Sequence, residues 1–200
     1  MYNWRRMTPE QRTEVMRHRQ LCSYPMHSPP HPEEPGRHCY HLSAANFEHA
    51  AIAGANPERL ATFADTLCTT LVGAGVALHA WCALPNHYHA LIGTEDLRGL
   101  LAQIGRLHGR TSFEWNREDS MRGRKCWHCC TDRRIRSDSH FFAVRNYIHH
   151  NPVKHGYVPK REEWPFSSAK EFLDAVGPRQ AADFWEMYPV LDMGEGWDTD

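Results

Sequence analysis

The chain has 200 residues and a formal net charge of -1, and 41% of its residues are hydrophobic. This length fits one globular domain with its own core and is too short for two large domains. No apolar run approaches the ~20 residues that cross a bilayer, and polar sequence follows residues 1–6 where a secretory signal would be apolar. We therefore expect a cytoplasmic protein with no membrane segment and with its seven cysteines reduced.

Charge is distributed unevenly along the chain. Residues 98–136 contain ten Lys/Arg and four Asp/Glu, whereas residues 171–200 contain one and eight. Lys and Arg side chains are the groups that neutralise nucleic-acid phosphates. The middle of the chain is therefore suited to face phosphates, and the C-terminal segment is not.

The N-terminal segment predicts a short helix and a linker. Thr8-Pro9-Glu10-Gln11 is typical of a helix start, with Thr8 as N-cap and Gln11 as its capping-box partner. Five prolines in residues 23–36 break both helix and strand. The predicted segments are a basic helix (1–22), a proline-rich linker (23–36), a catalytic domain (37–173) and an acidic tail (174–200).

The core is expected to begin with a strand at residues 38–45. A helix starts at Asn56-Pro57-Glu58, because its apolar residues follow the i, i+3, i+4 spacing. Residues 76–84 and 87–93 are strand-like and are separated by Pro85-Asn86, which predicts an antiparallel pair.

The second half of the core repeats this alternation. An amphipathic helix is expected from Leu97, and a short strand around residues 125–130. A last helix begins at Ser137 or Asp138 and runs to Asn151, where Pro152 is expected to stop it. The order predicts an α+β fold with a ferredoxin-like or RRM-like antiparallel sheet (βαββαβ), helices on one face, and an added C-terminal helix carrying Tyr147.

Two histidines have the spacing of metal ligands. His87 and His89 are two residues apart, so they project from the same face of a strand and can bind one cation. A chain with 15 histidines contains some such pairs by chance. Their place at the start of a strand, beside a turn that a substrate can reach, favours the metal role, and Tyr88 is expected to point into the core.

A tyrosine and an asparagine lie one helical turn apart. Tyr147 and Asn151 occupy positions i and i+4, which places a phenol and a carbonyl oxygen on one helix face, about 5–6 Å apart at Cβ. Taken singly, Tyr147 is typical of an aromatic residue at the edge of the core, and Asn151 is typical of a residue that ends a helix. The pair becomes informative only in combination with the histidines.

Three motifs in order make the chain resemble a known family. Residues 84–92 (LPNHYHALI), 147–158 (YIHHNPVKHGYV) and 164–168 (WPFSS) resemble the IS200-like single-tyrosine (Y1) HUH transposases, most closely the REP-associated tyrosine transposases. The resemblance covers roughly residues 36–173. The chain departs from the family pattern at Leu84, where Met is usual, and at Tyr88, where a smaller aliphatic residue is usual.

The resemblance implies a metal-dependent single-stranded DNA endonuclease and strand transferase that acts on hairpin-forming DNA through a 5′-phosphotyrosine intermediate. It implies that His87 and His89 bind Mg²⁺ or Mn²⁺, that Tyr147 is the nucleophile, and that Asn151 is the third ligand. It also implies single-stranded or hairpin DNA of the REP palindrome kind as partner, and a monomer or homodimer. Nitrogen ligands suit Mn²⁺ better than Mg²⁺.

Other residues are candidates for DNA contact. Arginine and lysine can bind phosphates, and Trp115 and Trp127 can stack on unpaired bases. The predicted DNA-binding residues are Arg110, Arg117, Arg122, Arg124, Lys125, Arg133, Arg134, Arg136, Trp127 and Lys154. His149 and His150 are expected on the helix surface, where one of them could assist proton transfer. Cys126, Cys129 and Cys130 resemble half a zinc site, but no second pair stands at a suitable distance.

Three functions compete on this evidence. The first is the strand-transferring enzyme, and the second is a non-catalytic hairpin-DNA-binding or regulatory protein that kept the fold. A metal nuclease acting on RNA without a covalent step is the third. The intact His-x-His and Tyr-x-x-x-Asn sets favour the enzyme, because a binding protein needs neither.

Overall fold

The computed structural model describes residues 36–190, together with residues 8, 10–11, 13–14 and 17 of the N-terminal segment. In that segment, the Thr8 amide donates to Oε1 of Gln11 at 2.9 Å, and the Gln11 amide donates to Oγ1 of Thr8 at 3.3 Å. The predicted capping box is therefore confirmed. The proline-rich linker lies outside the described residues.

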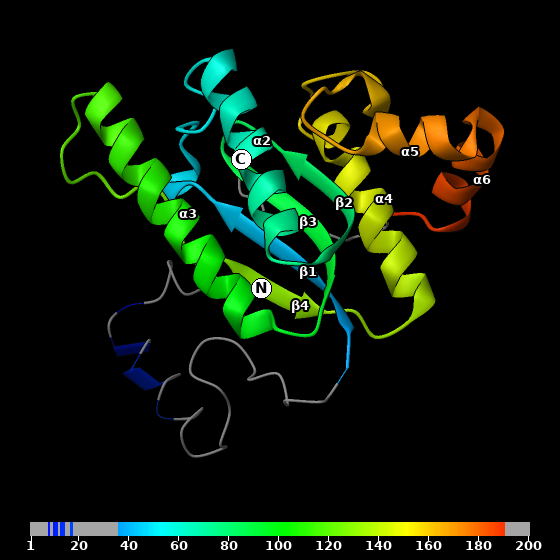
Figure 1. The fold of residues 1–200 in the computed structure, drawn as a ribbon, viewed down its shortest axis with the longest axis horizontal. Helices are drawn as coiled ribbons and strands as arrows, with labels where there is room; N and C mark the ends of the chain where they lie inside the picture. Colours follow the sequence, from blue (N-terminus) through cyan, green and yellow to red (C-terminus); the bar gives the residue numbers. More distant parts are fainter. Residues whose placement is uncertain (1–7, 9, 12, 15–16, 18–35, 191–200) are drawn as a thin grey trace. The chain divides into compact units, whose positions relative to one another are not determined.

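Four antiparallel strands form one sheet in the order β2-β3-β1-β4 (Figure 1). They are β1 (His38–Ala45), β2 (Ala77–Ala83), β3 (His87–Thr94) and β4 (Thr131–Arg134). With a helix after β1 and another after β3, this is the predicted ferredoxin-like βαββαβ arrangement. The fold prediction is confirmed, with β1 and β3 as the central strands.

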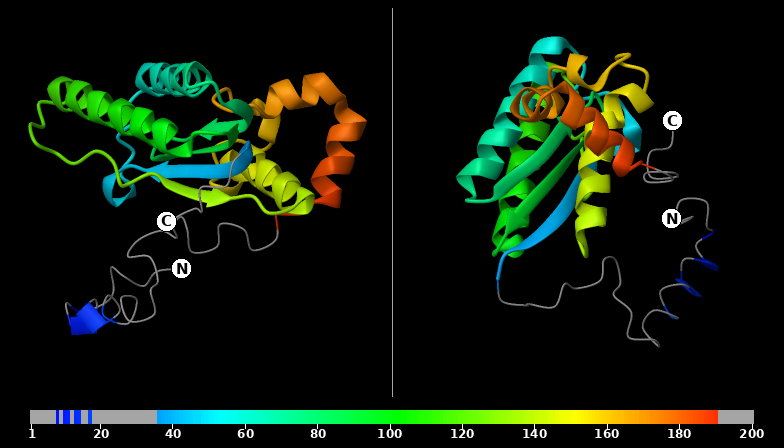
Figure 2. Two further views of the ribbon diagram at one scale, coloured as in Figure 1. Left: turned by 60° about the horizontal axis from the view of Figure 1, so that its bottom comes forward. Right: turned by 90° about the vertical axis from the view of Figure 1, so that its right-hand side faces the viewer.

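Helices cover both faces of the sheet. Helix α2 (Pro57–Gly73) and helix α3 (Leu97–Glu118) pack on one face, and α4 (Asp138–Lys154) packs on the other against β2 and β3 (Figure 2). Side chains of Asn56 and Ser137 cap α2 and α4 by accepting backbone N–H bonds. The helix expected to carry the tyrosine therefore covers the face of the sheet opposite to α2 and α3.

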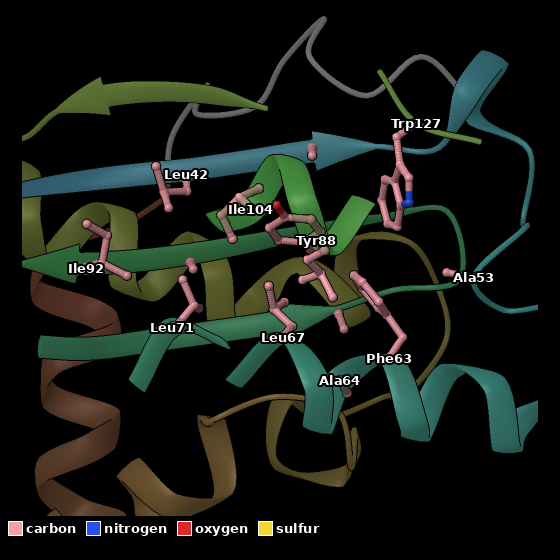
Figure 3. Packing of buried hydrophobic residues seen from close by; sticks show 14 of the residues in the cluster. Leu42, Ala53, Phe63, Ala64, Leu67, Leu71, Tyr88, Ile92, Ile104 and Trp127 are labelled. Atoms are coloured by element: carbon pink, nitrogen blue, oxygen red, sulfur yellow. The ribbon is translucent and has the colours of Figure 1, made fainter. Parts of the chain in front are cut away.

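The main core lies between the sheet and α2 and α3. Tyr88, fully buried, packs there with Phe63, Leu67, Ile92 and Trp127 (Figure 3). The Phe63 ring lies 5.8 Å from that of Tyr88 and 5.2 Å from that of Trp127. Tyr88 therefore points away from its histidine neighbours, as predicted from strand alternation.

Two boundaries differ from the sequence prediction. The fourth strand is Thr131–Arg134, whereas Trp127 makes only an isolated bridge with Asn46, because its indole is drawn into the core. Helix α4 continues through Pro152 to Lys154. Proline removes only its own N–H bond and its fixed φ is helical, so one further turn is tolerated at this end.

Residues 174–190, which the sequence analysis places in the acidic tail, are largely helical. Helix α5 (Ala169–Val176) and helix α6 (Pro178–Met187) pack together beside α4 (Figure 1), as does the short 3₁₀ helix η3 (Arg161–Glu163). The side-chain amide of Asn146 on α4 donates to the carbonyls of Phe184 and Tyr188, both at 2.8 Å. A second 3₁₀ helix, η2 (Phe47–His49), follows β1. No helix in the described residues is long and apolar enough to span a membrane.

Candidate active site

His87 and His89 lie on the face of β3 that α4 covers. Both are buried, at 3% and 2% exposure, and their ring centroids are 5.1 Å apart. Tyr88, between them, faces the opposite side and places its hydroxyl 3.1 Å from Nε2 of His108. Strand alternation thus brings the two imidazoles together, as their spacing predicts.

Helix α4 adds Tyr147 and Asn151 to the same site. Oδ1 of Asn151 lies 2.9 Å from Nε2 of His87, and the Tyr147 ring centroid lies 5.2 Å from that of His89. Both α4 residues are 0% exposed. The structure therefore brings together all four residues predicted as nucleophile and metal ligands, from elements about 60 residues apart in the chain.

Asn86 fixes the orientation of His87. Its side-chain nitrogen donates to the carbonyl of His49 at 3.2 Å, which directs its Oδ1 toward Nδ1 of His87, 2.7 Å away. An amide oxygen only accepts, so Nδ1 carries the proton and Nε2 keeps its lone pair. That lone pair faces Asn151.

The pair of acceptors formed by His87 and Asn151 fits a cation. In this tautomer and amide orientation, Nε2 of His87 and Oδ1 of Asn151 are both acceptors, and Nδ2 of Asn151 is buried without a hydrogen-bond partner in the described residues. Ligands at adjacent corners of an octahedron with bonds of about 2.1 Å lie about 3.0 Å apart. The observed 2.9 Å matches that separation. An amide rotated by 180° would instead donate to His87, so Asn151 is placed beside His87 in either orientation.

His41 is a third histidine at this site, and no sequence motif indicates it. Its Nε2 lies 3.1 Å from Nδ1 of His89, and its ring centroid lies 6.0 Å from that of Tyr147. When His89 donates Nδ1–H to His41, its own Nε2 keeps the lone pair that a metal ligand needs. His41 lies on a strand predicted from sequence, but only the pairing of β1 with β3 brings it to His89.

Two predicted basic residues lie near Tyr147. Nζ of Lys154 is 5.6 Å from the Tyr147 ring centroid. Partial burial lowers the pKa of Arg133, and the negative charge of a Tyr147 phenolate acts in the opposite direction. Arg133 is therefore within electrostatic range of the phenol.

The remaining predicted DNA contacts are dispersed. Arg110 and Arg117 belong to α3, across the sheet from Tyr147, and Arg122 and Arg136 are exposed. Three others have local contacts: Arg124 with Asp119, Lys125 over the Phe47 ring, and Arg134 with His38. Trp115 and Trp127 are 4% and 6% exposed and belong to the core. The prediction that their rings stack on bases is wrong, because packing against Phe63 buries them.

His149 is buried and not on the surface, contrary to expectation. Its Nε2 lies 3.1 Å from Oγ of Ser168, in residues 164–168, the third motif. Ser168 in turn bonds the backbone of Trp81 on the edge of β2. Burial, reinforced by the charges of Arg145 and Arg161, lowers the pKa of His149 to about 3. The third motif therefore joins the tyrosine helix to the sheet.

The cysteine cluster does not form one site in the structure. Sγ of Cys126 is buried 3.4 Å from Oδ1 of Asn116, Cys129 is exposed, and Sγ of Cys130 lies 3.8 Å from the Tyr88 hydroxyl. Within the described part of the chain, no group of three or more His, Cys, Asp or Glu residues is arranged to hold a metal ion. The candidate metal site combines two histidines with an amide oxygen.

Comparison with known proteins gives relatives of one kind. No family model matches the chain. It is 31% identical over 103 residues to a protein of Haemophilus influenzae named as a REP-associated tyrosine transposase, and the match covers 44% of this chain and 56% of that relative. The chain thus spans a little more than half of the relative's length. The resemblance indicated by the three motifs is confirmed.

A solved structure supports the fold assignment. The structure of a REP-associated tyrosine transposase bound to a REP hairpin matches with a TM-score of 0.54 at 17% identity, over 70% of this chain and 82% of that one. A crystal structure described as a transposase from Deinococcus radiodurans R1 matches with a TM-score of 0.41 at 16% identity, over 60% and 95%. The first of these supports the fold assignment.

Proposed function

We propose that this chain, which is similar in sequence and fold to REP-associated tyrosine transposases, is a metal-dependent endonuclease and strand transferase for single-stranded, hairpin-forming DNA. The observation that carries the proposal is the convergence of Tyr147, Asn151, His87 and His89 in one buried site. Neither core packing nor helix termination requires this set of polar groups to meet. Fold alone would not identify the activity.

In the proposed reaction the Tyr147 oxygen attacks a DNA phosphorus atom. The bond from phosphorus to the 3′-oxygen breaks, a 5′-phosphotyrosine forms, the phenol loses its proton, and the released 3′-oxygen takes up a proton. A phenol with a reference pKa near 10 is a weak nucleophile at neutral pH, so the positive charge of Arg133 beside it assists ionisation.

The metal-binding part of the site is formed by His87, His89 and Asn151. When bound there, Mg²⁺ or Mn²⁺ would polarise the scissile phosphate and stabilise the charge that develops on it. When His87 and His89 donate Nδ1–H to Asn86 and His41, each imidazole presents the lone pair of Nε2 to a metal ion.

Access to the nucleophile requires side chains to move. Tyr147 is 0% exposed, and Lys154 lies over its ring. A DNA strand reaches the hydroxyl only when such covering groups are displaced, and Lys154 is then placed to pair with the incoming phosphate. The protein could act as a monomer or as a homodimer.

The experiment is to trap a covalent adduct. A labelled hairpin oligonucleotide with a single-stranded flank, incubated with the protein and Mn²⁺, should give a DNA-protein adduct that resists denaturation. Tyr147→Phe should abolish it, and Tyr157→Phe, which changes a tyrosine 42% exposed to solvent, should not. An adduct that persists in Tyr147→Phe would refute the assignment.

A second candidate function is favoured by the complete burial of Tyr147. A non-catalytic hairpin-DNA-binding or regulatory protein would keep this residue as part of its packing. Such a protein would bind the hairpin equally well in the presence of chelator and when Tyr147 is replaced by Phe. It would not cleave the DNA, whichever metal ion is added. Cleavage by the wild-type chain would exclude this alternative.

A further inference from the structure

A second group of polar side chains lies on the side of α4 away from Tyr147. Arg145 and His149 are one turn apart on α4 and share a face, about 160° around the helix from Tyr147. Arg161 comes from η3 and Trp185 from α6, which lie beside α4 (Figure 2). We name Arg145, His149, Arg161 and Trp185 the α4–α6 cluster.

Aromatic rings join the members of the α4–α6 cluster. The guanidinium of Arg145 lies 4.2 to 5.0 Å from the ring centroids of Phe142, Phe172 and Phe184. The Phe172 ring is also 5.4 Å from the His149 ring and 6.2 Å from the Trp185 ring. Arg161 lies over Trp185 at 4.6 Å. Rings therefore cover the faces of both guanidinium groups and leave their N–H edges to find acceptors.

Part of each N–H edge is buried and has no acceptor within residues 36–190. Nε and Nη2 of Arg145, Nη1 of Arg161 and Nε1 of Trp185 are buried without a hydrogen-bond partner. Nδ1 of His149, whose side chain is 0% exposed, also has no hydrogen-bond partner among the described residues. Burial lowers the pKa of both arginines, and for Arg161 it outweighs the opposing effect of Glu162. In the described residues no carboxylate forms an ion pair with either arginine.

Both arginines are half-buried, and donors of a cation that are buried without an acceptor destabilise the fold, so this arrangement favours binding of an anion. The unsatisfied groups of the two arginines and the indole are all donors, and an acceptor is what the cluster lacks. These donors come from three neighbouring elements, α4, η3 and α6, and a tetrahedral anion offers oxygens in more directions than a planar carboxylate. Arginine forks are also the usual partners of phosphate.

We propose that the α4–α6 cluster binds a phosphate group, separately from the tyrosine centre. The phosphate oxygens accept from the edges of Arg145 and Arg161 and from the Trp185 indole. The group is either inorganic phosphate or a backbone phosphate of a nucleic acid. The site requires neither the metal ion nor Tyr147.

Titration calorimetry with inorganic phosphate at constant ionic strength tests the site. Arg145→Met and Arg161→Met keep a long side chain against the rings but remove the charge and the donors. Each should weaken phosphate binding about tenfold or more, because hydrogen bonds to charged groups contribute ~1.5–3 kcal/mol and about 1.4 kcal/mol corresponds to tenfold. Arg179→Met removes the same charge from an exposed position on α6 and should bind as the wild type does.

A thermal-melting series keeps the test valid if a variant is less stable. Phosphate should raise the Tm of the wild type and of Arg179→Met, while Arg145→Met and Arg161→Met should respond no more than to chloride at the same ionic strength. The proposal is overturned if all four proteins respond alike, or if the wild type does not distinguish phosphate from chloride.

A competition arm identifies the source of the phosphate. A single-stranded oligonucleotide without terminal phosphates, added with chelator, should displace inorganic phosphate if the site takes a nucleic-acid backbone. Unchanged phosphate binding in its presence assigns the site to the free anion. The chelator and the absence of cleavage keep this result independent of the proposed catalytic function.

Discussion

Replacing Asn86 with alanine removes the acceptor that fixes the tautomer of His87. The lost contact is a 2.7 Å hydrogen bond from a buried imidazole. Without it, His87 can carry its proton on Nε2, where it cannot bind a metal ion. Losing such an orienting partner lowers metal affinity by about 10- to 100-fold, which corresponds to ~1.4–2.7 kcal/mol.

The assay measures the Mn²⁺ affinity of the full chain by electron paramagnetic resonance or by calorimetry. Asn86→Asp, which keeps an acceptor oxygen at this position, should bind Mn²⁺ at least as well as the wild type. Adduct formation by Asn86→Ala should recover at saturating Mn²⁺, because the nucleophile is unchanged.

A matched control separates metal binding from stability. Asn56→Ala removes the N-cap of α2, whose side chain accepts from the Arg59 amide at 2.8 Å, and should cost about 1 kcal/mol of folding stability. It should leave Mn²⁺ affinity unchanged. Equal Mn²⁺ affinity in Asn86→Ala and the wild type would refute the reasoning about tautomers.

Three further changes test the packing around the site. Arg59→Met breaks the ion pair that lowers the pKa of Asp119 to about 2, so urea unfolding should show ~1–3 kcal/mol lower folding stability near neutral pH. The variant should also lose less stability than the wild type as the pH falls from about 4 to 2, and an unchanged stability profile over that range would contradict this. Trp127→Ala should cost ~3–5 kcal/mol in the same assay, and a negligible loss would mean that the indole is not core. Burial lowers the pKa of His108 to about 4, so the folded state takes up its proton less readily than the unfolded state, and stability falls as the pH drops from 6.5 to about 4. His108→Phe keeps the stack on Trp127 and should flatten that part of the pH profile.

Local patterns were sufficient for the elements and for part of the site. Alternation along a strand predicts that His87 and His89 lie on one face of the sheet and Tyr88 on the other. Helical spacing predicts that Tyr147 and Asn151 lie on one face of their helix. These relations span one to four residues, so the backbone geometry of a single element decides them. The capping box of Thr8 and Gln11 is of the same kind.

Relations between distant segments could not be obtained in this way. His41 lies at the site only because β1 pairs with β3. Trp127 is not on the predicted DNA-binding surface, because its indole is buried beside Phe63. The acidic charge of residues 174–200 predicts a tail, yet the side-chain amide of Asn146 on α4 binds the last turn of α6.

The sequence by itself therefore determined which residue types stand at metal-ligand and nucleophile spacing, and which strands and helices carry them. Only the tertiary structure decided that His87 meets Asn151 and that Asn86 and His41 contact the two imidazoles. It also decided that buried N–H groups of Arg145 and Arg161 lack acceptors among the described residues. The physical reason is that spacing acts along one element, whereas burial and partner choice depend on how separate elements pack.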